Sequence, residues 1–339
     1  MVVEEFAFLN PRSIAEAVSL HTKYGEDSRF FAGGTNLLYM MKRGVRKPRY
    51  LINLKTIRDL DLTTFDDTQG LRIGSLTTIE SLENSKLMKE KFPILAQAAK
   101  KIASPQIRYM ATVGGNLCQD VWCWYLLEDF PCWLNGGEYC FAPEGDNRYH
   151  HSVLGGYFCF AVHPSDLATA FCALDATLVI TGGDGTKEIS LESFLPGFTK
   201  VEGQLRQNIL KGDEILTEIR VAPRWQEAKG VFVKYAVRQS FDFALSSAAV
   251  TMRMENDRCA DVRIVIGGIA PLPFRARQAE AVLIGKRLDK TLLEDAVEQL
   301  FGKTIALSGN AYRIQISKDL VAKALGQLSF PYEEKFIAP

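Results

Sequence analysis

Cysteine is the residue type that most suggests chemistry in this chain, because five of its seven cysteines fall between Cys118 and Cys159. Thiolate sulfur binds zinc and iron–sulfur clusters, so a metal centre is one interpretation. The candidate ligands are separated by eight, seven and eighteen residues: Cys123, Cys132, Cys140 and Cys159. No C-x-x-C pair is present. From the spacing alone, buried cysteines are therefore as good an interpretation as a cluster.

The residues around these cysteines favour a cluster. Glycines, aromatic residues and turn formers fill the stretch, and tryptophans flank both Cys123 and Cys132, where they would exclude water. Thiolates in such a dry loop would otherwise be costly and reactive. Cys118, Cys172 and Cys259 are expected to be buried bystanders.

Two glycine turns beside this stretch suggest a nucleotide site. An expected strand, 29–32, leads into Gly33 and Gly34, and a helix should begin at Asn36 or Leu37. Backbone amides and the positive end of a helix there would bind a pyrophosphate. The alternative is a tight turn between strand and helix, since the pattern is neither G-x-G-x-x-G nor a P-loop. A second turn, 112–116, would allow the pair to grip a dinucleotide from two sides.

The surrounding pattern predicts mixed helices and strands in three units. Ser13 and Glu16 form a capping box ahead of a helix to about Tyr24, which opens a small βαβ unit over residues 1–56. The second unit, 57–224, includes the cysteine stretch 118–160. A third unit, 229–332, should have antiparallel strands followed by helices.

The composition excludes several classes of protein. The formal net charge is zero, the charged fraction is 24%, and there is no basic stripe of the kind that binds nucleic acid. The N-terminus has no basic segment before an apolar run, and no stretch approaches 18 apolar residues. We therefore expect a cytoplasmic protein, in whose reducing surroundings structural disulfides are rare.

The order of motifs resembles the FAD-binding (medium) subunit of the molybdenum hydroxylases, the xanthine dehydrogenase and carbon monoxide dehydrogenase family. The resemblance covers nearly the whole chain and rests on these segments: FAGGTNLL, IRYMATVGGNL, HPSDLATAFCALDA, EILTEI, VFVKYAVRQSFDFALSSAAV, APLPFRARQAEAVLIG and AYRIQIS. It implies an α+β protein. Its two-subdomain FAD-binding fold would be of the PCMH (vanillyl-alcohol oxidase-like) type, followed by a C-terminal domain with an antiparallel sheet and helices.

The resemblance also implies which residues contact FAD. The pyrophosphate would be bound by the first turn, which comprises Phe31, Ala32, Gly33, Gly34, Thr35, Asn36, Leu37 and Leu38. Many relatives have Asp at the position of Asn36. The second turn would complete the phosphate and ribose contacts through Thr112, Gly114, Gly115 and Asn116.

The resemblance implies FAD contacts at four further positions, and for three of them a purely structural role is the alternative. Ile102 would pack near adenine, and Asp166 would bind a hydroxyl of the ribose or ribityl chain, unless it is only a helix N-cap. Leu216 and Lys234 would lie by the isoalloxazine, where an ammonium could stabilise the reduced ring. Without the resemblance, Lys234 would be a solvated lysine and Leu216 a core residue.

A subset of the family, resembling 4-hydroxybenzoyl-CoA reductase, carries a cysteine loop that binds a [4Fe-4S] cluster. That likeness implies Cys123, Cys132, Cys140 and Cys159 as ligands and leaves Cys118 out. The segment between the first two ligands is shorter here than in that reductase. We assign no catalytic role to His150, His151 or His163, the last of which is expected to be structural.

The function implied is electron transfer by an oxidoreductase subunit that holds FAD and a [4Fe-4S] cluster. A large molybdopterin-binding subunit and a small [2Fe-2S] subunit would be its partners, in a dimer of heterotrimers, with an external carrier such as ferredoxin. Two alternatives remain: a self-contained FAD-dependent oxidoreductase, and a non-redox structural subunit whose four cysteines bind zinc.

Overall fold

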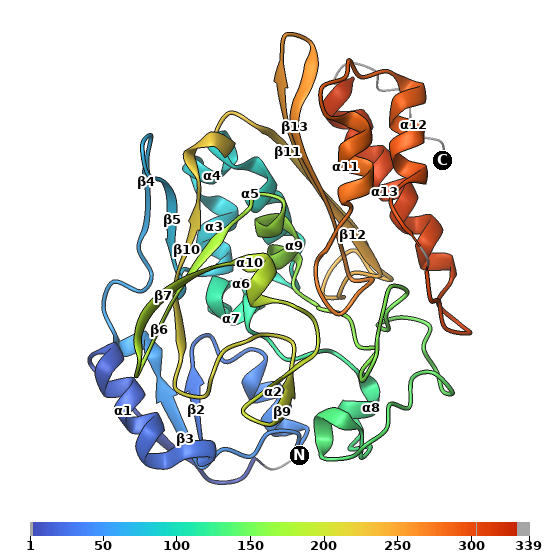
Figure 1. Cartoon of the computed structure of the whole chain (residues 1–339). Coiled ribbons are helices and arrows are strands. Elements are labelled where there is room, and N and C mark those ends of the chain that lie inside the picture. Colours follow the sequence, from blue (N-terminus) through green and yellow to red (C-terminus); the bar gives the residue numbers. More distant parts are fainter. Residues whose placement is uncertain (1–2, 303, 331–339) are drawn as a thin grey trace.

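A computed structural model describes residues 3–302 and 304–330 (Figure 1). The last residues of the predicted third unit, 331 and 332, lie outside the described ranges. Three main sheets follow one another along the chain, and each lies within one of the three predicted units. The boundaries between the units stay a prediction.

The first sheet is parallel, with the order β1-β3-β2. Its strands are β1 (Ala7–Leu9), β2 (Ser28–Phe31) and β3 (Tyr50–Asn53). Helix α1 (Ile14–Tyr24) joins β1 to β2 with the short helix η1 (Gly25–Asp27), and α2 (Leu37–Lys42) joins β2 to β3, which η2 (Leu54–Thr56) follows. The hydroxyl of Ser13 accepts a hydrogen bond from the amide of Glu16, which confirms the predicted helix start.

The second sheet is antiparallel, with the order β4-β5-β10-β6-β7. Its strands are β4 (Thr63–Asp66), β5 (Gly70–Gly74), β6 (Thr177–Gly182), β7 (Gly185–Ser190) and β10 (Ile215–Val221). A separate hairpin pairs β8 (Thr199–Val201) with β9 (Gln204–Arg206).

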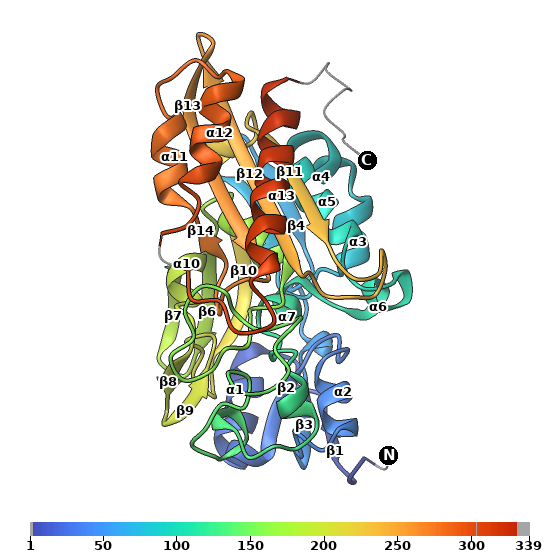
Figure 2. The same ribbon diagram turned by 90° about the vertical axis from the view of Figure 1, so that its right-hand side faces the viewer.

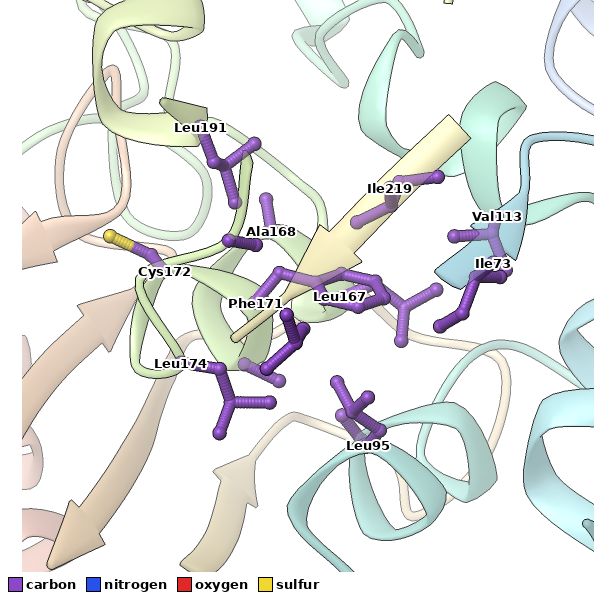
Figure 3. Close-up of a cluster of buried hydrophobic side chains, with 14 of the residues drawn as sticks. Ile73, Leu95, Val113, Leu167, Ala168, Phe171, Cys172, Leu174, Leu191 and Ile219 are labelled. Carbon is purple, nitrogen blue, oxygen red and sulfur yellow. The ribbon is translucent and has the colours of Figure 1, made fainter. Parts of the chain in front are cut away.

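Seven short helices accompany this sheet within the described residues: α3 (Ile79–Asn84), α4 (Lys86–Lys91), α5 (Pro93–Lys100), α6 (Pro105–Met110), α7 (Val113–Leu117), α9 (Asp166–Cys172) and α10 (Leu191–Phe194). Figure 3 shows the core they form, in which Leu167 and Phe171 of α9 pack with Leu95 of α5 and Ile219 of β10. Every residue of α9 is buried, so this helix fixes the position of the His-Pro-Ser-Asp segment that precedes and begins it.

The third sheet is antiparallel, with the order β11-β12-β13-β14. It follows η4 (Pro223–Trp225) and comprises β11 (Lys229–Tyr235), β12 (Ser246–Glu255), β13 (Arg258–Gly267) and β14 (Phe274–Arg275). One face packs against α11 (Arg277–Leu283), α12 (Lys290–Glu298) and α13 (Tyr312–Ser329), as Figure 2 shows.

Side chains on the two faces of these strands pack the third sheet against two different hydrophobic cores. Ala248 and Val250 of β12 face the C-terminal helices, whereas Ala249, between them, belongs to the core of the second unit. Successive side chains of a strand point to opposite faces, so one strand serves two cores. The sheet is therefore packed on both sides, and β11 brings its residues to the cavity described below.

Residues 118–160, hereafter the cysteine loop, contain little regular structure. Only α8 (Trp124–Leu127) and the single turn η3 (Trp133–Asn135) form there. In Figure 1 the loop is the green segment around α8, and it contacts both the N-terminal and the C-terminal unit. Arg46, just beyond α2, pairs with Asp120, and Asn310, just before α13, donates to the carbonyl of His151.

Candidate functional site

The first glycine turn approaches other backbone closely. Gly34 has a φ of +71°, a backbone conformation that would be strained for any residue with a side chain. The aromatic ring of Phe31 also occupies the space that a Cβ atom would need. At Gly33 a Cβ atom would overlap the carbonyl oxygen of Met110. Gly33 is thus required where the first turn meets the segment that precedes the second.

The second glycine segment differs from the prediction. It is a short helix, α7, and not an open turn, because the Thr112 hydroxyl accepts a hydrogen bond from the amide of Gly115 and caps it. Gly114 is needed for packing, since a Cβ there would lie 2.7 Å from Cβ of Ser75. The side chain of Asn116 accepts a hydrogen bond of 2.6 Å from the Ser165 hydroxyl, which ties α7 to the start of α9.

The two glycine segments share one cavity of about 570 Å³, hereafter the glycine cavity. This volume is within the usual range for cofactor sites. Twelve of the sixteen predicted FAD contacts line it: Ala32, Gly33, Gly34, Thr35, Asn36, Leu37, Ile102, Thr112, Gly115, Asn116, Asp166 and Lys234. Phe31, Leu38, Gly114 and Leu216 do not line it. Leu216 lies on β10 in the hydrophobic core.

Asp166 and Lys234 form an ion pair at the cavity wall. Their Oδ2 and Nζ atoms are 2.7 Å apart, and the two side chains are only 5% and 6% exposed. Burial raises the pKa of Asp166, and the Lys234 ammonium opposes that shift. The alternative role of Asp166 as N-cap of α9 is wrong, because Ser165 is the N-cap and its hydroxyl accepts from the amide of Ala168. Lys234 is likewise no solvated lysine.

Several lining residues were missed by sequence reasoning. Arg29 stands at the cavity close to Arg46 and Arg206, and burial, together with these two cations, lowers its pKa. Trp122 lines the cavity as well, and its ring packs at a tilt against Tyr39 and Phe243, at centroid distances of 4.7 and 5.2 Å. Arg29 lies on β2, the strand that leads into the first glycine turn, and this position was the one signal in the sequence. The approach of Phe243 could not be inferred from local sequence.

The four predicted ligand cysteines gather in one place. Cys123, Cys132 and Cys159 belong to a single buried cluster with Val121, Leu126 and Ala161. The thiol of Cys140 is hydrogen-bonded to that of Cys159, which lowers the pKa of Cys140 to about 6 and raises that of Cys159. All seven cysteines are free thiols.

These four cysteines differ from the other three in what surrounds the sulfur. Backbone amides near each of the four sulfurs act to lower its pKa: Tyr125 and Leu126 at Cys123, Leu134 and Asn135 at Cys132, Ala142 and Phe160 at Cys140, and Ala161 at Cys159, where the amide donates a hydrogen bond of 3.5 Å. Burial alone raises the pKa of Cys118 to about 12, and neither Cys172 nor Cys259 receives a backbone donor. Amide donors stabilise negative charge on sulfur. In the described part of the chain, however, no three His, Cys, Asp or Glu side chains are arranged to hold a metal ion.

Of the histidines of this region, His151 and His163 are buried and His150 is partly exposed. Burial lowers the pKa of His150, His151 and His163 to about 4. Nδ1 of His163 accepts a hydrogen bond from the amide of Ser165, so this side chain orders the turn before α9. Nε2 of His151 lies 3.4 Å from the sulfur of Cys123.

Comparison with known proteins defines the class. A family model described as the FAD binding domain in molybdopterin dehydrogenase matches residues 4–225, and one described as the CO dehydrogenase flavoprotein C-terminal domain matches residues 231–328. The chain therefore belongs to the family of FAD-binding subunits of molybdopterin dehydrogenases. This confirms the predicted family, and with it an oxidoreductase subunit that binds FAD.

Individual relatives agree with this assignment. The carbon monoxide dehydrogenase medium chain of Afipia carboxidovorans is 30% identical over 88% of this chain and 86% of its own length. The aldehyde oxidoreductase FAD-binding subunit PaoB of Escherichia coli is 30% identical over 96% of this chain and 98% of its own length. Among solved structures, a Cu,Mo-CO dehydrogenase chain superposes with a TM-score of 0.76 at 26% identity, covering 97% of this chain and 99% of that one.

The predicted fold, a mixed FAD-binding part followed by an antiparallel C-terminal domain, is confirmed by the same matches. These matches define the family as a whole. The more specific likeness to 4-hydroxybenzoyl-CoA reductase stays a prediction. Within residues 3–302 and 304–330, no helix has the length and apolar character needed to span a bilayer.

Proposed function

We propose that this FAD-binding subunit also carries a [4Fe-4S] cluster on Cys123, Cys132, Cys140 and Cys159. The subunit would pass electrons between FAD and an external one-electron carrier such as ferredoxin. A large molybdopterin-binding subunit and a small [2Fe-2S] subunit would complete the enzyme, as a dimer of heterotrimers. When bound, FAD exchanges two electrons in single steps, and a [4Fe-4S] cluster carries one at a time.

The setting of the four sulfurs is the observation that carries the cluster proposal. Neighbouring backbone amides act to lower the pKa of each of the four proposed ligands and of none of the three other cysteines, and the amide of Ala161 donates to the sulfur of Cys159. Cysteines buried only as packing residues have no need of such donors, whereas metal-bound thiolates are stabilised by them. The donors come from residues two or three positions after each cysteine, except Phe160, so the local backbone is already wrapped around each sulfur.

The residues fit the cluster in type, but their sulfurs do not stand in an arrangement that holds a metal ion and would have to move to bind one. Cys123, Cys132 and Cys159 are each less than a tenth exposed, in a water-poor setting. Because the loop contains little regular structure, closing the four sulfurs on a metal requires no helix or strand to unfold. Four thiolates also suit zinc, so the donor set alone does not distinguish the two metals.

For FAD, we propose that the two glycine segments bind the pyrophosphate and that Lys234 faces the isoalloxazine. The ammonium of Lys234 also donates to the carbonyl of Lys101 at 3.0 Å, which places it beside Ile102. Adenine at Ile102 and isoalloxazine at Lys234 would then occupy the same end of the cavity. We therefore propose that Ile102 lies by the isoalloxazine and not by adenine. Arg29 would neutralise phosphate charge.

The purified complex tests the cluster directly. The expected result is a flavin spectrum with a broad iron–sulfur shoulder and about four iron and four sulfide per chain. Cys132→Ser should lose this iron and keep FAD, whereas the matched variant Cys118→Ser should keep both. Zinc in place of iron, or equal iron in both variants, would contradict the proposal.

The isolated chain tests the electron-transfer role. The chain purified alone should show no turnover of an organic substrate, and activity should appear when the molybdopterin subunit is added. Turnover by the isolated chain would instead favour a self-contained flavin enzyme.

A further inference from the structure

Two residues with an unusual backbone conformation meet at the opening of the glycine cavity. Among the residues that the structure describes, eight other than glycine have a positive φ, and five of these are Asp or Asn, which tolerate it best. Two of the remaining three are Ala103, at +43°, and Phe241, at +72°. The amide of Phe241 donates a hydrogen bond of 2.9 Å to the carbonyl of Ala103, and both residues line the cavity.

This hydrogen bond attaches residues 101–103 to the segment that follows β11. The ammonium of Lys234, on β11, donates to the carbonyl of Lys101 at 3.0 Å, and the amide of Phe241 binds the carbonyl of Ala103. Ile102, between these two carbonyls, lines the cavity and is only 8% exposed. The backbone of Phe241 is therefore held one residue away from Ile102.

An ion pair closes the turn that carries Phe241. The backbone amide of Arg238 donates to the carboxylate of Asp242 at 2.9 Å, and its guanidinium donates to the same carboxylate at 2.6 Å. The guanidinium lies 5.9 Å from the centre of the Phe241 ring. Phe241 is nevertheless 57% exposed. A bulky residue at positive φ is strained, and burial of so exposed a ring offsets little of that strain.

We propose that Phe241 covers the isoalloxazine of bound FAD on the side of the cavity that opens to solvent. This inference rests on the proposed position of the isoalloxazine beside Ile102. A planar ring against buried Ile102 would meet Phe241 at the opening. Contact between two aromatic systems removes apolar surface of both from water. The strained backbone is then retained because it holds the aromatic ring at this place.

The test of the cover is the access of iodide, a soluble quencher of flavin fluorescence, to FAD in the intact complex. Phe241→Ala should increase quenching and speed the release of FAD about fivefold, the loss expected for one aromatic contact. Tyr157→Ala is the matched control, because Tyr157 is 91% exposed and does not line the cavity. It should change neither quantity.

Phe241→Gly separates the strain from the cover. Both Phe241→Ala and Phe241→Gly remove the ring, but only glycine relaxes at positive φ. In urea unfolding of the complex, the folding equilibrium constant should be about fivefold larger for the glycine variant than for the alanine variant. FAD release and quenching should be the same in both. Equal stability of the two variants would contradict the strain at Phe241.

Ile102→Ala tests the position of the isoalloxazine independently, because its smaller side chain opens the wall on the other side of the ring. Quenching that rises in Ile102→Ala but stays at the wild-type value in Phe241→Ala overturns the cover and leaves the proposed position intact. Quenching unchanged in both variants refutes the proposed position of the isoalloxazine, and the cover with it. Faster FAD release in Phe241→Ala without a change in quenching also overturns the inference, since Phe241 would then contact another part of FAD.

Discussion

The glycine cavity and the cysteine loop are neighbouring sites built on different principles. Short helices and strands shape the cavity, and its critical positions are those where a side chain is missing, such as Gly33 and Gly34. The loop has almost no regular structure and is ordered by rings that pack on one another, including Tyr125, Phe130 and Phe141 at centroid distances of 5.1 to 6.1 Å. Substitutions that enlarge a side chain should therefore disturb the cavity most, and substitutions that remove an aromatic ring should disturb the loop most.

The two sites share part of a wall, because the loop lines the cavity with Cys118, Gln119, Asp120, Trp122 and His150. The side chain of Asn36, in the first glycine turn, accepts a hydrogen bond from the amide of Asp120 in the loop, and Trp122 belongs to both. If the sites are separate units, variants of the cavity should lose FAD and keep iron. The predictions below test that separation.

The largest effect is expected from the buried pair of Asp166 and Lys234. Both side chains are about 95% buried. Lys234→Met or Asp166→Asn alone therefore leaves one buried charged group without its ionic partner. Breaking such a pair costs about 3–5 kcal/mol of unfolding free energy, whereas replacing both members is often nearly neutral. Urea unfolding should show the double variant Asp166→Leu/Lys234→Met to be more stable than either single one.

Cofactor content of the same variants sharpens the comparison. Both single variants should lose FAD during purification and retain the iron of the wild type. A parallel loss of iron would mean that the two sites form one cooperative unit. A double variant less stable than both singles would contradict the assignment of a buried ion pair.

Gly33→Ala is the next largest prediction. The added Cβ would overlap the backbone oxygen of Met110, which no side-chain rotation can relieve. We expect a loss of about 2–3 kcal/mol, typical of overpacking, together with loss of FAD. Gly326→Ala in α13 is the control, because its Cβ would meet open space and the helix should gain up to about 1 kcal/mol. Calorimetry and flavin fluorescence measure both.

Acid should destabilise the protein through His163, the histidine that orders the turn before α9. The pKa of His163 is about 4 in the folded protein and 6.5 without burial, so the folded state binds fewer protons between these values. Stability is unaffected above pH 6.5 and falls as the pH drops towards 4, by about 1.4 kcal/mol per unit for this one group. In the His163→Gln variant, the unfolding free energy measured by urea titration should fall less steeply with decreasing pH, by the amount that His163 contributes. A slope unchanged in the variant would show that His163 does not titrate with unfolding.

The sequence allowed good prediction where local rules apply. The helix from Ile14, the start of α2 at Leu37 and the meeting of the two glycine segments at one cavity follow from capping, strand pattern and glycine placement. The second glycine segment was missed as a helix because a single hydroxyl, that of Thr112, decides it.

Contacts between distant segments could not be predicted. Lys234 was assigned to the flavin, but nothing local indicates that its partner is Asp166, 68 residues earlier in the chain. The burial of Arg313, whose guanidinium donates to carbonyls of His151, Leu245 and Gly268, likewise depends on three separate segments. Such positions are set by packing of whole units, for which a single sequence carries no periodic signal.

The smallest effect is expected at Asn36, the position where the family resemblance led us to expect Asp in many relatives. Its Oδ1 accepts the amide hydrogen of Asp120, and a carboxylate oxygen can accept the same bond. Asn36→Asp should therefore change stability by less than about 0.5 kcal/mol and FAD affinity by less than about twofold. Asn36→Leu leaves the Asp120 amide without this acceptor and should cost about 1–2 kcal/mol. If Asn36→Asp loses FAD while Asn36→Leu does not, a negative charge at this position repels the phosphates. The contact between cavity and loop would then be incidental, and the two sites would be more independent than the shared hydrogen bond suggests.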